Sequence, residues 1–280
     1  MAQPHIIALW SAPRSLSTSF AKSFSQRDDA VVLHEPFSDC YYFSALRKSA
    51  QFGDHAPAHD ENGATVEARI SASCIASSIS QPAWSVASLS PSTCASPSAP
   101  ACTHGVKPLI FFKELAYQAE PYVTEAFLKK VRHTFLIRHP FRIAHSLKAR
   151  NHAFNDDDLG VEPLQRLFDR VRKLQDAPPV VVDADQLGTA SERTLTRYCD
   201  ALQLHFDPRM LQWRQGQIRA WHPHEQASQS VWHDTTAAST CFAPAPPLPS
   251  LAQLDLSAAQ WQCVSKAEEI YQSLSQWIPK

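Results

Sequence analysis

Glycine is scarce in this chain of 280 residues, which contains six glycines and none before Gly53. The loop GxxxxGK[ST], which wraps the phosphates of a nucleoside triphosphate, is therefore missing from the N-terminal part, and no lysine precedes Ser15 or Ser17. This absence argues against the usual P-loop mode of binding a nucleoside triphosphate.

Long apolar runs and an excess of one charge are also lacking. No stretch approaches the roughly 20 apolar residues that cross a bilayer, and the start "MAQPHIIALW" has neither the basic residues nor the apolar length of a secretory signal. The formal net charge of -1 gives no general attraction to nucleic acid or acidic membranes. We therefore expect a cytoplasmic protein that binds neither, in which any anion site is local.

Cysteine and histidine show no pattern typical of metal sites. The seven cysteines are odd in number and scattered, with no CxxC pair, which predicts reduced and mostly structural thiols. The stretch "WHPHE" (221–225) and nearby His233 invite a metal hypothesis, but no helical HxxxH or matching carboxylate accompanies them. We expect no metal, and the oligomeric state stays open. The cysteines are Cys40, Cys74, Cys94, Cys102, Cys199, Cys241 and Cys263.

Short β-rich runs alternate with helical patterns along the chain. Near-continuous apolar runs of this length are typical of parallel strands covered on both faces. Alternation of strands and helices predicts an α/β fold with a doubly wound, mainly parallel sheet flanked by helices, in one domain spanning 1–280. The predicted strands are 5–10, 30–35, 108–114, 133–139 and 179–185.

Helix boundaries are predicted from apolar spacing and capping signals. Apolar residues recur at helical spacing over 15–26 and 161–175, and Pro121 stands where an N1 proline would start another helix. Capping boxes are predicted for two later helices. Their residue pairs are Thr189 with Glu192 and Ser257 with Gln260.

Two segments depart from this regular alternation. Residues 71–104 are dominated by Ser, Ala and Pro with hardly a charge, which predicts a low-complexity insertion whose second half is poorly ordered. Residues 213–250 mix Trp, His and Gln with the proline-rich tail "APAPPLPS", which predicts an irregular, lid-like segment.

The turn "SAPRSLST" (11–18) follows the first predicted strand. A strand that runs directly into a helix leaves unpaired N–H groups at the helix N-terminus, where they hold anions. Arg14 adds a forked cation, and the hydroxyls of Ser15, Ser17 and Thr18 add donors. The turn therefore predicts a phosphate site, although such residues also serve simply to cap and start a helix.

The stretch "APRSLST" resembles the 5′-phosphosulfate loop of sulfotransferases that use 3′-phosphoadenosine 5′-phosphosulfate (PAPS), where Pro, Lys or Arg, Ser, Gly, Thr and Thr are usual. In "IRHPFRIAHS", Arg138 and Ser146 have the eight-residue spacing of that family's 3′-phosphate site. Pro140 starts the helix, which places Ser146 about two turns in. As an alternative, Arg138 simply caps a strand.

Further stretches resemble a bacterial and fungal branch of the same family, over most of the chain except roughly 45–105. The resemblance implies a P-loop NTPase-like fold, PAPS as cosubstrate and no required metal. The stretches are "LHEPFSDCYY", "FFKELAY", "VVDADQL" and "WHDTTAASTCF".

The sequence departs from the family pattern at two places. Leu16 replaces the loop glycine, which predicts that this position avoids a positive φ. The K-x-H arrangement of many animal enzymes stands here as Lys113, Glu114 and Leu115, so the usual histidine base is missing.

Catalytic roles are predicted for Glu35 and Lys113. Related enzymes use a glutamate at the end of the second strand, and the resemblance carries the role of base to Glu35. Pairing with Arg14 or helix capping is the alternative. His34 is the obvious substitute, but strand alternation predicts that it points to the opposite face. Lys113 would stabilise the bridging oxygen between phosphate and sulfate, unless it is a solvated surface lysine.

The late segment supplies three weaker candidates. "WRQG" (213–216) resembles the R-x-G loop that closes over the 3′-phosphate, which makes Arg214 a candidate donor-binding residue. Trp221 or Trp232 could cover the adenine or the acceptor, and a core position is an equal alternative for either.

We therefore expect the protein to transfer a sulfuryl group from PAPS to a hydroxyl or amine of a small metabolite that the sequence does not identify. One alternative is a P-loop small-molecule kinase using ATP and Mg²⁺, for which Asp183 would be a metal-binding aspartate. Another is a non-catalytic nucleotide-binding relative that has kept the phosphate cradle.

Overall fold

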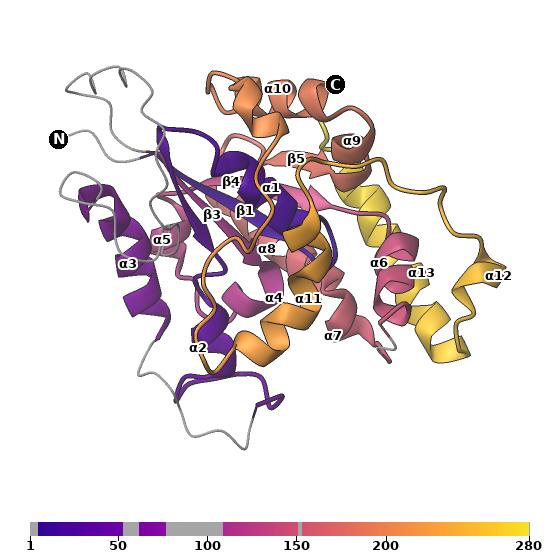
Figure 1. Cartoon of the computed structure of the whole chain (residues 1–280). Helices are drawn as coiled ribbons and strands as arrows, with labels where there is room; N and C mark the ends of the chain where they lie inside the picture. Colours follow the sequence, from indigo (N-terminus) through magenta and orange to yellow (C-terminus); the bar gives the residue numbers. More distant parts are fainter. Residues whose placement is uncertain (1–4, 53–61, 77–108, 151–152, 280) are drawn as a thin grey trace, which may run out of the picture.

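A five-stranded parallel sheet forms the centre of the protein (Figure 1). The computed structural model describes residues 5–52, 62–76, 109–150 and 153–279. The spatial order is β2-β3-β1-β4-β5 and every neighbouring pair is parallel. The doubly wound α/β fold and all five predicted strands are confirmed. The strands are β1 Ile6–Ser11, β2 Ala30–His34, β3 Leu109–Leu115, β4 Arg132–Ile137 and β5 Val180–Asp183.

Helices cover both faces of this sheet (Figure 1). Alternation along β1 sends Ile7 and Leu9 toward α1, and Ala8 and Trp10 toward the opposite core. The first face packs against α1 Ser17–Phe24, α9 Ala184–Thr189, α10 Ser191–Ala201 and η1 Pro208–Leu211. Helices α3 Gly63–Ala76, α5 Glu125–Leu128, α6 Pro140–Lys148, α8 Val161–Leu174 and α13 Ala258–Ser275 pack on the second.

Five further helices complete the described chain. They are α2 Ser38–Tyr42, α4 Ala116–Ala119, α7 Asp156–Leu159, α11 Gln226–Ala238 and α12 Leu251–Leu254. Because β1 lies between β3 and β4, the chain changes direction across the sheet at the carboxyl end of β1. Open α/β sheets bind ligands at such a switch point.

Of the five predicted helix signals, three are confirmed and two are wrong. The predicted helices over 15–26 and 161–175 are confirmed as α1 and α8, and the capping box of Ser257 and Gln260 begins α13. Pro121 is not the first residue of a helix, because α5 begins later, where the Thr124 hydroxyl accepts from Phe127 N at 3.2 Å. Thr189 ends α9 instead of capping α10. Its hydroxyl donates to the carbonyl of Asp185 at 2.9 Å.

The two irregular segments have different outcomes. Residues 71–76 belong to α3, whereas 77–104, with the part predicted to be poorly ordered, lie outside the described residues. The centre of 213–250 forms α11, so the prediction of an irregular segment was wrong there. The buried ammonium of Lys22 on α1 donates to the carbonyls of Gly216 and Thr236 at 2.9 and 3.1 Å. These hydrogen bonds hold the late segment against α1.

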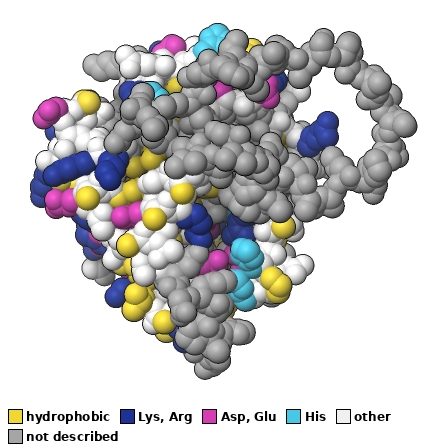
Figure 2. Space-filling model, turned by 90° about the vertical axis from the view of Figure 1, so that its left-hand side faces the viewer, with side chains coloured by type: hydrophobic (Ala, Val, Ile, Leu, Met, Phe, Trp, Pro, Cys, Tyr) yellow, Lys and Arg dark blue, Asp and Glu magenta, His cyan; other side chains and the backbone are white. Residues whose placement is uncertain are grey.

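Three further observations concern the cysteines, the apolarity of the helices and the surface charge. Of the described cysteines, Cys40, Cys199, Cys241 and Cys263 are free thiols. Within the described ranges, no helix combines the length and apolarity needed to span a membrane. On the face shown in Figure 2, dark blue basic side chains lie beside magenta acidic ones, so charge of both signs is mixed there.

Candidate functional site

A cavity of about 1470 Å³ opens at the carboxyl edge of the sheet. It is larger than the roughly 300–1,000 Å³ that one small ligand fills, so it has room for a nucleotide and a second molecule. The cavity is lined by nine of the ten residues predicted from the sequence: Arg14, Ser15, Leu16, Ser17, Thr18, Glu35, Lys113, Arg138 and Ser146. Arg214 is exposed and lies outside this lining.

The turn between β1 and α1 is strained. Arg14 has φ 57 and Leu16 has φ 65, so the prediction that Leu16 avoids a positive φ was wrong. The turn must join a buried strand to a buried helix in a few residues, and that geometry outweighs a cost of about 1–3 kcal/mol per strained residue. Leu16 gives α1 no side-chain cap. The first N–H groups of α1 therefore depend on a ligand or water.

Gly160 supports this turn from behind. It has φ +61, and a Cβ there would lie 2.5 Å from Cδ of Pro13. Only glycine fits so close to the proline without displacing it, because the contact is shorter than real Cβ atoms make. The position of the turn at residues 11–18 therefore depends on Gly160, which is far away in the sequence.

Arg14 joins the two predicted phosphate-binding elements. Its Nε donates to Oγ of Ser146 at 2.9 Å and its Nη1 donates to the carbonyl of Trp232 at 2.8 Å. Arg138 donates to the carbonyl of Arg14. Burial, together with the charges of Arg150 and Arg138, lowers the pKa of Arg14 to about 10. Desolvated cations that repel one another make a local site for an anion.

Arg138 has one donor without a partner. Its Nε is buried, makes no hydrogen bond to any described residue, and lies 4.0 Å from a carboxylate oxygen of Asp185. The Nε of Arg142 is closer to that carboxylate, at 2.6 Å from its other oxygen. Arg138 therefore keeps hydrogen-bonding capacity at the cavity wall.

Glu35 and Lys113 form a buried ion pair at the same edge of the sheet. Their residue exposures are 6% and 1%, and Lys113 Nζ donates to Oε1 of Glu35. Burial opposes the charge on Glu35, but the charge of Lys113 with smaller contributions from His34 and His233 holds the pKa of Glu35 well below its usual range. The alternatives of a solvated Lys113 and of a Glu35 paired with Arg14 are both wrong.

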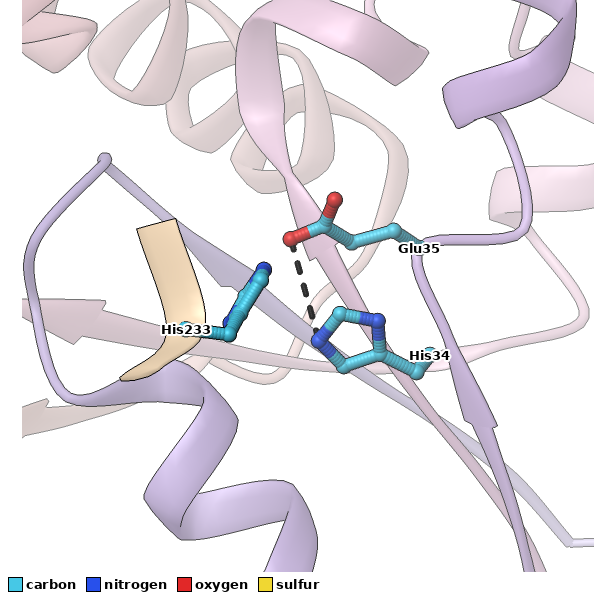
Figure 3. Close-up of side chains that lie close together, drawn as sticks. All are labelled: His34, Glu35 and His233. Atoms are coloured by element: carbon cyan, nitrogen blue, oxygen red, sulfur yellow. Dashed lines mark ion pairs between the residues drawn. The ribbon is translucent and has the colours of Figure 1, made fainter. Parts of the chain in front are cut away.

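His34 lies on the same side as Glu35, so its predicted opposite orientation was wrong (Figure 3). Strand alternation ends with β2 at His34, and Glu35 has φ 49, which turns its side chain back. His34 Nε2 is 3.8 Å from Glu35 Oε1. Burial, the largest effect, lowers the pKa of His34 well below its usual value, so the imidazole is neutral.

His233 of α11 completes the cluster drawn in Figure 3. Its Nδ1 lies 3.4 Å from the Thr18 hydroxyl, and its Nε2 lies 3.0 Å from Oε1 of Gln229. Burial, with the nearby charges of Lys113 and Arg14, lowers the pKa of His233 to about 4. His233 lines the cavity, but sequence spacing gave no signal that placed it beside Glu35.

Glu114 is a further buried acid that sequence reasoning missed. Its two carboxylate oxygens accept hydrogen bonds from Phe37 N at 2.7 Å and from Leu115 N at 2.8 Å. Burial and the charge of Glu35 raise the pKa of Glu114 to about 8. Glu114 lies outside the cavity lining and ties the turn after Glu35 to the end of β3.

Aromatic side chains occupy both ends of the cavity. Trp232 lines it, with its ring 5.8 Å from the guanidinium carbons of both Arg14 and Arg150. Trp221 instead packs inside, stacked on His233 at 5.1 Å. Near Glu35, the lining includes Tyr41, Tyr42, Phe43, Phe52 and Tyr117.

Asp183, considered above as a metal-binding aspartate, is held away from the cavity. Its Oδ1 accepts from Asp185 N at 2.7 Å and its Oδ2 accepts from the Tyr271 hydroxyl at 2.6 Å. The side chain caps α9 and is not part of the cavity lining. Its oxygens are occupied by structural hydrogen bonds.

Known proteins resemble the chain at the level of sequence. Two Arabidopsis thaliana proteins, branched-chain-amino-acid aminotransferase-like proteins 2 and 1, are 30% and 29% identical over 237 and 245 residues, or 85% and 86% of this chain. The chain spans 36% and 37% of the length of these relatives.

A solved sulfotransferase domain from the curacin biosynthetic pathway aligns over 100% of both chains, with 16% identity and a TM-score of 0.46.

The family profile described as sulfotransferase domain matches residues 67–267. This match covers well over half of the 280 residues. The chain belongs to the sulfotransferase domain family.

Proposed function

We propose that the protein transfers a sulfuryl group from PAPS to a hydroxyl or amine of a small metabolite. The observation that carries this proposal is the direct hydrogen bond between Arg14 of the first turn and Ser146 of α6, beside Arg138, in the wall of one cavity. Membership of the sulfotransferase domain family supports the reaction class.

Glu35 and Lys113 would act in sequence. The ammonium of Lys113 donates to the carboxylate of Glu35 and holds the pKa of Glu35 low, which makes Glu35 a weak base. A bound phosphosulfate would draw Lys113 toward its bridging oxygen, and the pKa of Glu35 would rise as its partner leaves. The base would thus gain strength when the donor is in place.

Transfer then needs no further group. The acceptor oxygen or nitrogen bonds to sulfur while the bond between sulfur and the bridging oxygen breaks. The adenosine bisphosphate leaves with that electron pair, which Lys113 stabilises, and the acceptor proton passes to Glu35. The aromatic rings near Glu35 offer a surface for the acceptor.

A non-catalytic nucleotide-binding protein is the second candidate, because the resting ion pair of Lys113 with Glu35 is compatible with binding alone. The kinase alternative is weakened, because the carboxylate of Asp183 is occupied by structural hydrogen bonds.

The first test is a thermal-shift comparison, without metal, of 3′,5′-adenosine bisphosphate against AMP, with ATP and Mg²⁺ as a third ligand. At about 100 times its Kd, a ligand adds about 2.7 kcal/mol of stability, which is enough for a shift of a few degrees. A shift with the bisphosphate alone supports the proposal. A larger shift with ATP and Mg²⁺, or none, overturns it. Binding without turnover over a broad acceptor panel favours the non-catalytic candidate.

A further inference from the structure

Glu35 is a buried carboxylate that requires a cation, and Lys113 supplies one. Two imidazoles face the same carboxylate from different elements: His34 at the end of β2 and His233 from α11 (Figure 3). Neutral imidazole nitrogen and carboxylate oxygen are the donors that zinc and its neighbours prefer. Local spacing in the sequence gives no signal for this group, because His233 lies far along the chain from the neighbouring pair His34 and Glu35.

The distances are close to those of a metal site. One ligand atom from each of His34, Glu35 and His233 lies within 4.8 Å of the others. Two ligands bound tetrahedrally to one zinc ion, each at about 2.0–2.2 Å, are about 3.4 Å apart. His34 Nε2 and Glu35 Oε1 are already 3.8 Å apart. Side-chain movements on the order of 1 Å would therefore close the site.

The surrounding groups favour metal binding at His233 and weaken it at His34. Gln229 Oε1, 3.0 Å from His233 Nε2, accepts the proton that remains when Nδ1 binds a metal. The Nδ1 of His34 is buried and without a partner among the described residues, so a metal on Nε2 would leave its N–H unpaired. The nearby cations Lys113, Arg14 and Arg219 also oppose a dication.

We propose that His34, Glu35 and His233 bind a divalent transition metal of the zinc type when the ammonium of Lys113 leaves Glu35. The fourth position faces the cavity, which Glu35 and His233 both line. A metal held there competes with Lys113 for Glu35 and occupies the carboxylate assigned to proton transfer, so it inhibits the protein reversibly instead of serving the reaction.

The competition with Lys113 gives the sharpest test. The full chain is titrated with Co²⁺, and the visible absorption of four-coordinate cobalt is recorded together with the heat of Zn²⁺ binding. Lys113→Met removes the competing ammonium, so we expect Zn²⁺ and Co²⁺ to bind more tightly than to the wild type, by about tenfold or more. A metal would also restore some of the stability that the unpaired Glu35 costs.

Two further variants keep the test decisive if Lys113→Met does not fold. His233→Gln should abolish the cobalt spectrum, and Gln229→Leu should weaken binding by about 10- to 100-fold. His205→Gln, at an exposed histidine that does not line the cavity, is the matched control and should bind as the wild type does.

Equal metal affinity in the wild type and His233→Gln, or weaker binding after Lys113→Met in a folded protein, overturns the proposal. The readouts are spectra and heats, so they stand apart from sulfuryl transfer. If adenosine bisphosphate fails to bind while the cobalt spectrum follows these expectations, the proposed function fails and the metal site remains.

Discussion

The two charged regions of the cavity differ in how their charge is balanced. Around Glu35 and Lys113 the opposite charges meet directly, and the histidines beside them are neutral. Around Arg14 the guanidinium donates to the Ser146 hydroxyl and to the backbone carbonyl of Trp232, and Arg138 keeps a buried Nε without a hydrogen bond to any described residue. The charges of the first region balance each other, whereas the second region has excess positive charge. From this difference we expect an anion to bind at the arginines and proton transfer, as proposed, to take place at the ion pair.

Glu35→Gln tests the region around Glu35 and Lys113 and should have the largest effect. The amide keeps the size of the side chain but cannot accept a proton, so we expect kcat to fall by about 10²- to 10⁴-fold. Turnover with an identified acceptor measures the loss, and the affinity for adenosine bisphosphate should stay within a few-fold of wild type. Wild-type turnover in this variant would show that Glu35 is not the base.

Acid should protonate the neutral histidines beside Glu35 and Lys113, so that this region also gains positive charge. His233 has a pKa of about 4 in the folded protein against an ordinary 6.5. Its contribution to stability is therefore present above pH 6.5 and is lost as pH falls toward 4, by up to about 3 kcal/mol. Urea unfolding at both pH values measures this loss. His233→Gln should lose less, and an equal loss in both proteins would contradict the neutral histidine.

Arg138→Ala tests the region with excess positive charge. Loss of a charged hydrogen-bond donor costs about 1.5–3 kcal/mol, so the Kd for adenosine bisphosphate should rise by about 10- to 100-fold. The Kd for AMP should change much less, because AMP has no 3′-phosphate. Calorimetry with both nucleotides separates the two outcomes, and equal losses for both would place Arg138 elsewhere on the donor.

Arg214→Ala should have the smallest effect. Its side chain is exposed and does not line the cavity, so we expect the Kd for adenosine bisphosphate to stay within about twofold of wild type, as for most surface changes. The same calorimetry measures it. A loss as large as that of Arg138→Ala would restore Arg214 as a residue that closes over the donor.

The sheet and the first turn were predictable because local patterns determine them. Apolar runs predicted every strand of the described sheet. The turn chemistry of residues 11–18, together with the spacing of Arg138 and Ser146, predicted residues that the structure brings to one cavity. Parallel strands place their carboxyl ends at one edge, so order along the chain was enough to bring these residues together.

The remaining parts of the site depend on backbone geometry and on tertiary contacts. The positive φ of Glu35 reverses the expected direction of its side chain relative to His34. A glutamate at this position gives no sign in the sequence that its φ is positive. His233 reaches Glu35 because Lys22 holds the α11 segment on α1, across nearly two hundred residues of sequence. Such contacts leave no periodic signal in the chain.

The strained turn at Arg14 and Leu16 has a kinetic consequence. Neither residue is glycine, and both hold left-handed backbone angles in a turn that contacts within the protein support, because Arg138 donates to the carbonyl of Arg14 and Gly160 packs against Pro13. The cradle therefore exists before the donor arrives, and no loop rearrangement has to precede capture. We expect bisphosphate association to follow a single exponential whose rate rises linearly with ligand concentration, without the plateau that a slow conformational step would impose.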